Sequence, residues 1–209
     1  DKSVYQLFQS QPPADGGDLL VQPREEHLWL LPASTALATL ERQLGTREGM
    51  GLVLARQLAA WSGRFEYALI DCPPMLGVLM VNALAACDHL VIPVQTEFLA
   101  LKGLEHMLHT LAMVMRTRKT ELPCTIVPTL FDRRTRASLE SLRMLQERHG
   151  AQLWPAAIPV DTQFREASRS GATPARLFPH TRGVLAYQAL LDTLLGADVS
   201  TPRLAGAGA

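Results

Sequence analysis

The chain has little cysteine, and its cysteines form no motif. Cys72, Cys87 and Cys124 stand far apart in apolar surroundings, without a C-x-x-C pair or the spacing of a metal site. The six histidines are scattered and show no H-E-x-x-H pattern. A disulfide framework and a zinc site are therefore excluded, and the cysteines are expected to be small core residues in a reducing cytosol.

Long apolar runs and an excess of charge of one sign are also missing. The longest apolar stretch, residues 75–86, is shorter than the ~18–20 residues of a membrane span, and Asn82 interrupts it. We therefore expect no stable membrane insertion and a cytoplasmic location. The 20 basic and 20 acidic residues cancel, so any affinity for nucleic acid must come from local clusters of charge.

The sequence does contain an alternation of helix-like and strand-like segments. Apolar residues at steps of three and four predict helices at 3–8, 35–43, 50–61, 78–86, 99–115, 138–149 and 183–195. Short apolar or β-branched runs predict strands at 27–31, 65–71, 89–94, 124–127 and 153–158. This order predicts an α/β fold with a doubly wound, mostly parallel sheet in one domain, 1–195, followed by a flexible tail, 196–209.

Polar and small residues gather where four of these strands end, at 71–74, 93–97, 128–132 and 158–161. The carboxyl ends of parallel strands share one edge of a sheet and line one crevice. Asp71 follows an apolar run directly, which is where phosphate-binding sheets place a carboxylate that serves Mg²⁺. The alternative is a polar loop in which Asp71 caps the next element.

Taken in order, these blocks resemble the ParA/MinD family of deviant Walker-A P-loop ATPases, and most of all its ParA branch of partition and positioning proteins. The matching segments are YALIDCPP at 67–74, VIPVQTEF at 91–98, LKGL at 101–104, TLFDRRT at 129–135, IP at 158–159, REA at 165–167 and RG at 182–183. The resemblance spans about residues 20–195, and it implies the P-loop NTPase fold.

The resemblance also implies roles for individual residues. Asp71 would be the Walker-B aspartate, a catalytic residue that holds Mg²⁺ through water. Gln95 and Glu97 would belong to the switch region or a dimer face, although Glu97 is equally interpretable as an exposed loop residue. The residues that would border the nucleotide are Pro128, Thr129, Pro159, Val160 and Asp161. The implied cofactors are ATP and Mg²⁺.

The phosphate-binding loop of that family does not occur in this sequence, since no G-x-x-x-x-G-K-[ST] segment is present in any register. That loop supplies the backbone N–H groups, the lysines and the hydroxyl that hold the phosphates and Mg²⁺. We therefore expect the domain to be incomplete at its N-terminus, and the 209-residue chain alone to lack ATP hydrolysis.

Basic residues cluster in the second half of the chain, where eight of them stand against four acidic residues between positions 116 and 148. The ParA branch binds DNA without sequence preference through basic side chains, and such phosphate contacts need clustered Arg or Lys. The implied DNA contacts are Arg133, Arg134, Arg136, Arg165 and Arg169. The alternative is a solvated face of helices.

The leading hypothesis is a ParA-like ATP-dependent switch that dimerises, binds DNA and positions or segregates a plasmid, a chromosome or a large protein assembly. Its partners would be a second copy of the chain, non-specific DNA and a ParB-like or other cargo adaptor, and it would associate with the nucleoid or a cell pole. The alternative is a non-catalytic protein-interaction module on a degenerate ParA-like scaffold. A membrane-associated MinD-like ATPase ranks last, because residues 196–209 lack a basic amphipathic pattern.

Overall fold

The computed structural model describes residues 2–9, 16–23, 25–44, 50–73, 75, 77–116 and 121–196. They belong to two compact units, Asp1–Asp88 and His89–Ala209. The first unit contains the 3-10 helices η1 (Val4–Phe8), η2 (Gly17–Leu19) and η3 (Met50–Leu52), and the helices α1 (Ala36–Leu44), α2 (Val53–Ala60) and α3 (Val78–Ala86). The second contains the strands β1 (Leu90–Gln95) and β2 (Cys124–Thr129) and the helices α4 (Phe98–Met115), α5 (Arg136–His149), α6 (Gln163–Arg169), α7 (Pro174–Leu177) and α8 (Arg182–Leu194).

The second unit is built around β1 and β2, which pair in parallel from Leu90 opposite Cys124 to Gln95 opposite Thr129. Alternate residues of β1 are buried, as expected for a strand covered on one face, whereas three consecutive residues of β2 are buried. β2 is therefore the central strand of this unit. The predicted α/β class with a parallel sheet is confirmed.

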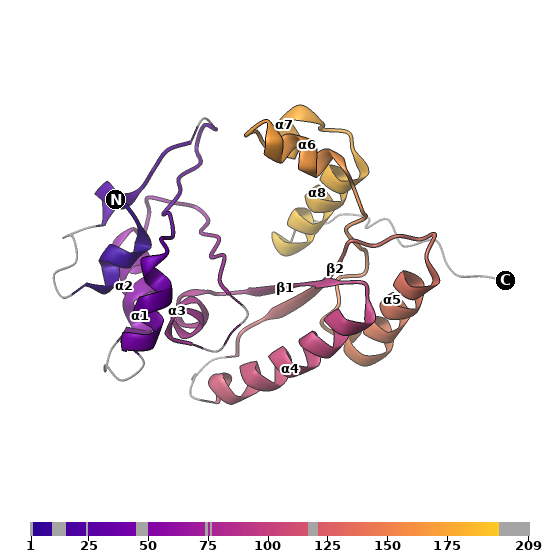
Figure 1. Cartoon of the computed structure of the whole chain (residues 1–209), viewed down its shortest axis with the longest axis horizontal. Helices are drawn as coiled ribbons and strands as arrows, with labels where there is room; N and C mark the ends of the chain where they lie inside the picture. The colour runs from indigo at the N-terminus through magenta and orange to yellow at the C-terminus, as the bar shows by residue number, and fades with distance from the viewer. Residues whose placement is uncertain are drawn as a thin grey trace. The chain divides into compact units, whose positions relative to one another are not determined.

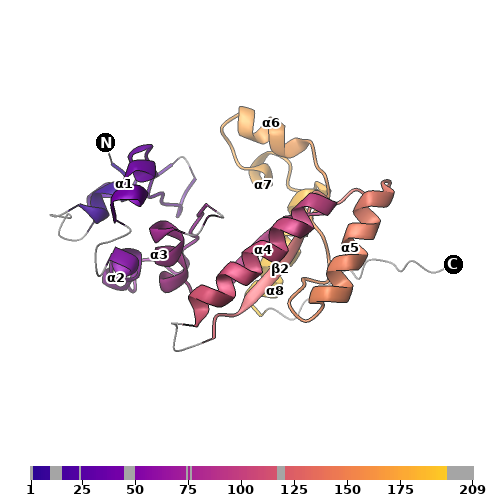
Figure 2. The same cartoon turned by 60° about the horizontal axis from the view of Figure 1, so that its bottom comes forward.

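Helices cover both faces of β2, with α4 and α5 on one side and α8 on the other (Figures 1 and 2). On the α8 side, Val127 of β2 packs with Trp154, Ile158 and Leu190 in one apolar cluster. On α4, Leu101, Leu104 and Leu111 are buried at the spacing that predicted this helix. Helices on both faces are the arrangement expected of a parallel sheet.

The predicted strand at 153–158 is only partly formed along the free side of β2. Trp154 N–H donates to the Ile126 carbonyl at 2.9 Å and Ile158 N–H donates to the Pro128 carbonyl at 2.8 Å. The two donors are thus four residues apart, whereas their acceptors on β2 are only two residues apart, so the segment 154–158 bulges away from β2. Pro155 lies in the bulge and has no N–H to donate, which explains why only isolated bridges form here.

Two strands predicted in the first unit do not form. Residues 65–71 carry neither helix nor strand, and the Leu69 side chain is fully exposed. A strand exists only where a neighbour accepts its N–H and C=O groups, and no described residue pairs with this segment. The predicted strand 27–31 is reduced to one antiparallel bridge, Val21 with Leu30, beside His27 at φ 60°.

The other predicted elements are confirmed to within two residues at each end, except that 50–61 divides into η3 and α2. The sequence did not reveal the short helices α6 and α7, because so few of their residues are buried that no apolar periodicity arises. The predicted tail lies outside the described residues beyond Gly196. Among the described helices, none combines the length and the apolar content that a membrane span requires. The single domain over 1–195 stays a prediction.

A buried amide holds the helices of the first unit together. Asn82 of α3 is fully buried, and its Nδ2 donates to the carbonyls of Met50 at 2.7 Å and Val78 at 2.8 Å. Its Oδ1 accepts from Leu54 N–H at 3.1 Å. These bonds link α3 to η3 and α2, so the polar residue that interrupts the apolar run joins neighbouring helices.

We expect Asn82→Ala to lower the free energy of unfolding by about 2–3 kcal/mol, because it leaves a buried N–H and a buried carbonyl without partners. The exposed Ser62→Ala in the same unit is the control and should change stability by less than about 0.5 kcal/mol. Urea unfolding followed by circular dichroism measures both variants. If the Asn82→Ala variant were as stable as the control, the hydrogen bonds of the Asn82 amide would not contribute to the stability of this unit.

Candidate functional site

Three of the four predicted strand ends meet at one edge of the second unit, formed by residues 95–97, 129–132 and 158–161 and called the strand-end edge below. Thr96 N–H donates to the Thr129 carbonyl at 3.1 Å. Phe131 N–H donates to the Ile158 carbonyl at 3.0 Å, and Val160 N–H donates to the Phe131 carbonyl at 3.1 Å. The predicted convergence of these three ends is therefore observed.

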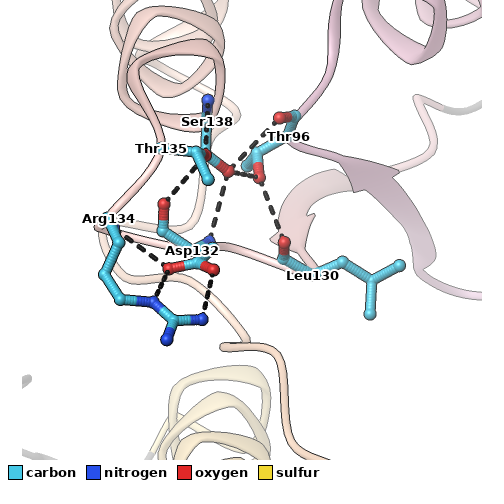
Figure 3. Close-up of polar contacts among 6 residues, drawn as sticks. All are labelled: Thr96, Leu130, Asp132, Arg134, Thr135 and Ser138. Atoms are coloured by element: carbon cyan, nitrogen blue, oxygen red, sulfur yellow. Dashed lines mark hydrogen bonds and ion pairs between the residues drawn. The ribbon is translucent and has the colours of Figure 1, made fainter.

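Two buried hydroxyl groups tie this edge to the start of α5 (Figure 3). Thr96 Oγ1 and Ser138 Oγ lie 2.5 Å apart, and both residues are buried. Asp132 N–H donates to Ser138 Oγ at 3.2 Å. Thr135 is the N-cap residue of α5, and its hydroxyl accepts from Ser138 N–H at 3.3 Å. Side-chain oxygens of Thr135 and Ser138 thus hold the two ends of the loop between β2 and α5 together.

Asp132 binds one of the arginines of that loop. Its carboxylate accepts from Arg134 Nε at 2.9 Å, from Arg134 Nη2 at 2.7 Å and from Arg134 N–H at 3.0 Å (Figure 3). The side-chain hydrogen bonds from Arg134, followed by its backbone N–H, lower the pKa of Asp132 to about 2. The carboxylate is therefore ionised throughout the physiological range, and it offsets the charge of Arg134.

Leu130 holds an unusual backbone conformation between Thr129 and Phe131. Its φ is 51°, in the left-handed region that non-glycine residues adopt at a cost of ~1–3 kcal/mol, and its side chain is 51% exposed. Its carbonyl lies 3.4 Å from Thr96 Oγ1. The strained residue thus belongs to the same hydrogen-bonded edge.

Asp161 joins the N-terminal ends of two helices. Its Oδ1 accepts from Gln163 N–H at 3.0 Å, at the start of α6, and its Oδ2 accepts from Gly183 N–H at 3.0 Å, in the first turn of α8. Desolvation alone would raise the pKa of Asp161, but the backbone N–H donors of Gly183 and Gln163 together lower it. A Cβ at residue 183 would overlap the Phe164 ring, which explains the glycine there.

The other residues predicted to border the nucleotide differ in exposure. Pro128 is buried in β2, Thr129 and Pro159 are half-buried, and Val160 is exposed. Their contact with a nucleotide, like that of Asp161, stays a prediction. Gln95 and Glu97 are exposed on either side of Thr96, so the predicted switch residues lie at this edge.

Asp71 belongs to the first unit, whereas the strand-end edge belongs to the second. Its side chain is exposed, and the neighbouring Cys72 is half-buried. Burial raises the pKa of the Cys72 thiol, and the charge of Asp71 raises it further. Within the described ranges, no group of three or more acidic, histidine or cysteine residues gathers around a possible metal ion. The role of Asp71 at a magnesium ion stays a prediction.

The predicted DNA contacts are all exposed, but their charges are not equivalent. Arg133, Arg136 and Arg165 have no ion pair with any described residue, whereas Arg134 pairs with Asp132 and Arg169 lies 3.6 Å from Glu166. Arg133 lies in the loop between β2 and α5, and Arg136 is the first residue of α5. Both follow the strand-end edge within four residues along the chain, and neither charge is offset by an ion pair with a described residue.

Sequence reasoning missed Ser138, and it gave Thr96 no role of its own. The two hydroxyls are 42 residues apart along the chain, so only the fold reveals their contact. It also did not predict that the charge of Arg182 helps to lower the pKa of both Asp132 and Asp161. The one available signal was Thr135, because a Thr just before a predicted helix is a common N-cap residue.

Comparisons with known proteins agree with this fold. A family model described as an AAA domain matches residues 1–124. The chain is 33% identical over 188 residues to the sporulation initiation inhibitor protein Soj of Bacillus subtilis, which covers 90% of this chain and 74% of that protein. It is 30% identical over 173 residues to the chromosome-partitioning ATPase Soj of Treponema pallidum, with 82% and 68% covered. An uncharacterised Mycobacterium tuberculosis protein is 33% identical over 93% of this chain, which spans only 61% of that relative's length.

A solved structure with sequence similarity gives the same architecture. Cobyrinic acid a,c-diamide synthase from Mycobacterium smegmatis, with a bound ATP analogue and magnesium, superposes with a TM-score of 0.70 at 34% identity. The superposition covers 84% of this chain and 65% of the synthase. The P-loop NTPase architecture is thus shared with a nucleotide-binding protein.

We expect Asp161→Asn to lower the free energy of unfolding by about 1 kcal/mol near neutral pH, since the amide can replace only part of the double cap. Because the folded state lowers the pKa of Asp161, the carboxylate stabilises the fold above its ordinary pKa and loses this effect as pH falls through the lowered one.

The deficit of the variant should therefore be constant near neutral pH and should shrink as pH falls below the ordinary pKa of an aspartate. Urea unfolding at several pH values measures it, with the exposed Glu140→Gln as control. A deficit that does not change as pH falls would show that the charge of Asp161 does not stabilise the caps.

Proposed function

Because the chain belongs to the ParA/MinD family of P-loop ATPases, we propose that it serves an ATP-dependent switch. The switch dimerises, binds DNA without sequence preference, and positions or segregates a plasmid, a chromosome or a large protein assembly. The observation that carries the proposal is the 33% identity to Soj across 90% of the chain. A relative at 30% identity is named a chromosome-partitioning ATPase.

ATP and Mg²⁺ are the cofactors of this proposal. Bound ATP would supply the γ-phosphate whose presence favours one arrangement of the switch residues. Asp71 would hold the Mg²⁺ ion through water, and its exposure leaves room for such waters. No phosphate-loop motif occurs in the 209 residues, so this chain supplies one carboxylate of the site and not the phosphate cradle.

DNA binding is assigned to the arginines of the second unit. Arg133 and Arg136 lie in and beside one loop at the strand-end edge, and Arg165 lies on α6. All three are exposed and free of ion pairs with the described residues. Such charges contact DNA phosphates by releasing counterions, which requires no readout of bases. Arg134 contributes less in this proposal, because Asp132 already offsets its charge.

The partners of the switch are a second copy of the chain, non-specific DNA and a ParB-like or other cargo adaptor. DNA binding would place the protein on the nucleoid. The competing hypothesis, a non-catalytic interaction module, differs in one measurable respect, because such a module has no nucleotide-dependent affinity for DNA. Titration of a non-specific duplex with the full-length gene product, in ATP and in ADP, separates the two.

We expect Arg133→Gln to weaken binding to a non-specific duplex and to reduce the salt slope of the binding constant by about 1, because one phosphate contact is lost. Arg134→Gln should have a smaller effect on both quantities, since Asp132 already pairs with this side chain at 2.7 Å. Fluorescence anisotropy in ATP at several salt concentrations measures both variants. Equal effects of the two substitutions, or an unchanged slope for Arg133→Gln, would remove this loop from the DNA-binding surface.

We expect Asp71→Ala to reduce Mg²⁺ affinity or ATP turnover of the full-length gene product by about 10–100-fold, as removal of a group that orders metal-bound water does. Its side chain is exposed and has no hydrogen bond or ion pair with the described residues, so the urea midpoint should stay constant. Glu66→Ala, an exposed carboxylate on the same segment, is the matched control. Full turnover in the Asp71→Ala variant would rule out the Walker-B role.

A further inference from the structure

The hydrogen bond between Thr96 Oγ1 and Ser138 Oγ can run in either direction, because either hydroxyl can be the donor. Each hydroxyl has one proton to donate and two lone pairs that accept. Thr96 Oγ1 lies 2.5 Å from Ser138 Oγ and 3.4 Å from each of the Thr129 and Leu130 carbonyls. Ser138 Oγ lies 3.3 Å from the Thr96 carbonyl. There are thus more acceptors than protons.

In the first arrangement, Thr96 donates its proton to Ser138 Oγ, and Ser138 donates to the Thr96 carbonyl. This pattern binds the start of α5 to the backbone at the end of β1. In the second arrangement, Ser138 donates to Thr96 Oγ1, and Thr96 donates to the carbonyl of Leu130 or Thr129. This pattern binds the side chain of Thr96 to the end of β2 instead, and it leaves the Thr96 carbonyl without the hydroxyl.

The two arrangements act on different parts of the strand-end edge. Gln95 and Glu97 flank Thr96 directly, so a shift of this exposed turn moves the Thr96 carbonyl relative to Ser138. Ser138 Oγ also accepts from Asp132 N–H, which begins the loop that carries Arg133 and Arg134. Leu130 has a strained backbone, with φ at 51°, and its carbonyl is one of the two acceptors in the second arrangement. Because that arrangement strengthens the bond to this carbonyl, it helps to hold the conformation of Leu130.

We propose that Thr96 and Ser138 are positioning residues which couple the Gln95–Glu97 turn to the arginine loop, residues 133–136, by exchanging these two hydrogen-bond patterns. The coupling rests on the proposed function, since it supplies the route by which a nucleotide-dependent turn changes DNA affinity. A buried pair of this kind has two discrete arrangements, which is the physical requirement for transmission between two sites. Exposed side chains of the turn and of the loop would be the two ends of the route.

The variant Thr96→Val tests the coupling, because it keeps the shape of the side chain and removes the hydroxyl. In the full-length gene product, the ratio of affinities for a non-specific duplex in ATP and in ADP should fall by about fivefold or more, the size of a typical coupling between sites. Thr96→Ser restores the hydroxyl and should restore the ratio. Ser141→Ala, which removes another buried hydroxyl of α5 outside this network, should leave the ratio unchanged.

A second measurement needs no nucleotide. Amide hydrogen exchange at residues 132–136 should be about fivefold faster or more in Thr96→Val than in the parent, at equal global stability, and unchanged in Ser141→Ala. Unchanged exchange at these amides overturns the coupling, and so does an unchanged affinity ratio in a parent that responds to ATP. Faster exchange in a protein whose parent shows no response to ATP would instead contradict the proposed function and leave the hydroxyl relay in place.

Discussion

The parallel pairing of β1 with β2 is the constraint on which the candidate site depends. Its register places Gln95 opposite Thr129, so both strands end at the same level. The next residue, Thr96, then donates its N–H to the Thr129 carbonyl, and its hydroxyl reaches Ser138. A slip of one residue would turn Ile92 and Val94 from the core to solvent, so burial protects the register. The apolar core thus fixes the position of polar groups at its edge.

Two carboxylates at this edge are used for backbone order. Asp132 holds Arg134, and Asp161 holds the starts of α6 and α8. Arg182 adds positive charge near both of them. Both carboxylates already have hydrogen-bond partners. The positive potential near the edge therefore comes from arginines that form no ion pair with either of these acids. Fixed carboxylates therefore decide which arginines remain available to an anionic partner.

The sequence correctly predicted elements that depend on the spacing of nearby apolar residues. It did not predict features that depend on contacts between residues far apart in the chain. The helices α4, α5 and α8 followed from apolar residues at steps of three and four, and β1 and β2 from short apolar runs. The run at 65–71 has the same composition, yet it forms no strand, since pairing depends on a neighbour that composition does not encode. The site shows the same limit. The strand ends were found from their polar residues, whereas the double cap of Asp161 joins residues 22 positions apart.

The strand-end edge is also where the chain departs from its own local rules. Leu130 adopts a left-handed backbone and exposes an apolar side chain, and the first two residues of α4, Phe98 and Leu99, are 60% and 75% exposed. A core would not retain such features, because each costs free energy that packing elsewhere must offset. The Leu130 carbonyl lies 3.4 Å from Thr96 Oγ1, and Phe98 follows Thr96 by two residues, so exposed apolar side chains stand next to the buried hydroxyls. The buried hydroxyls then have a clear physical task, since a strained and exposed edge needs internal bonds to keep a defined shape.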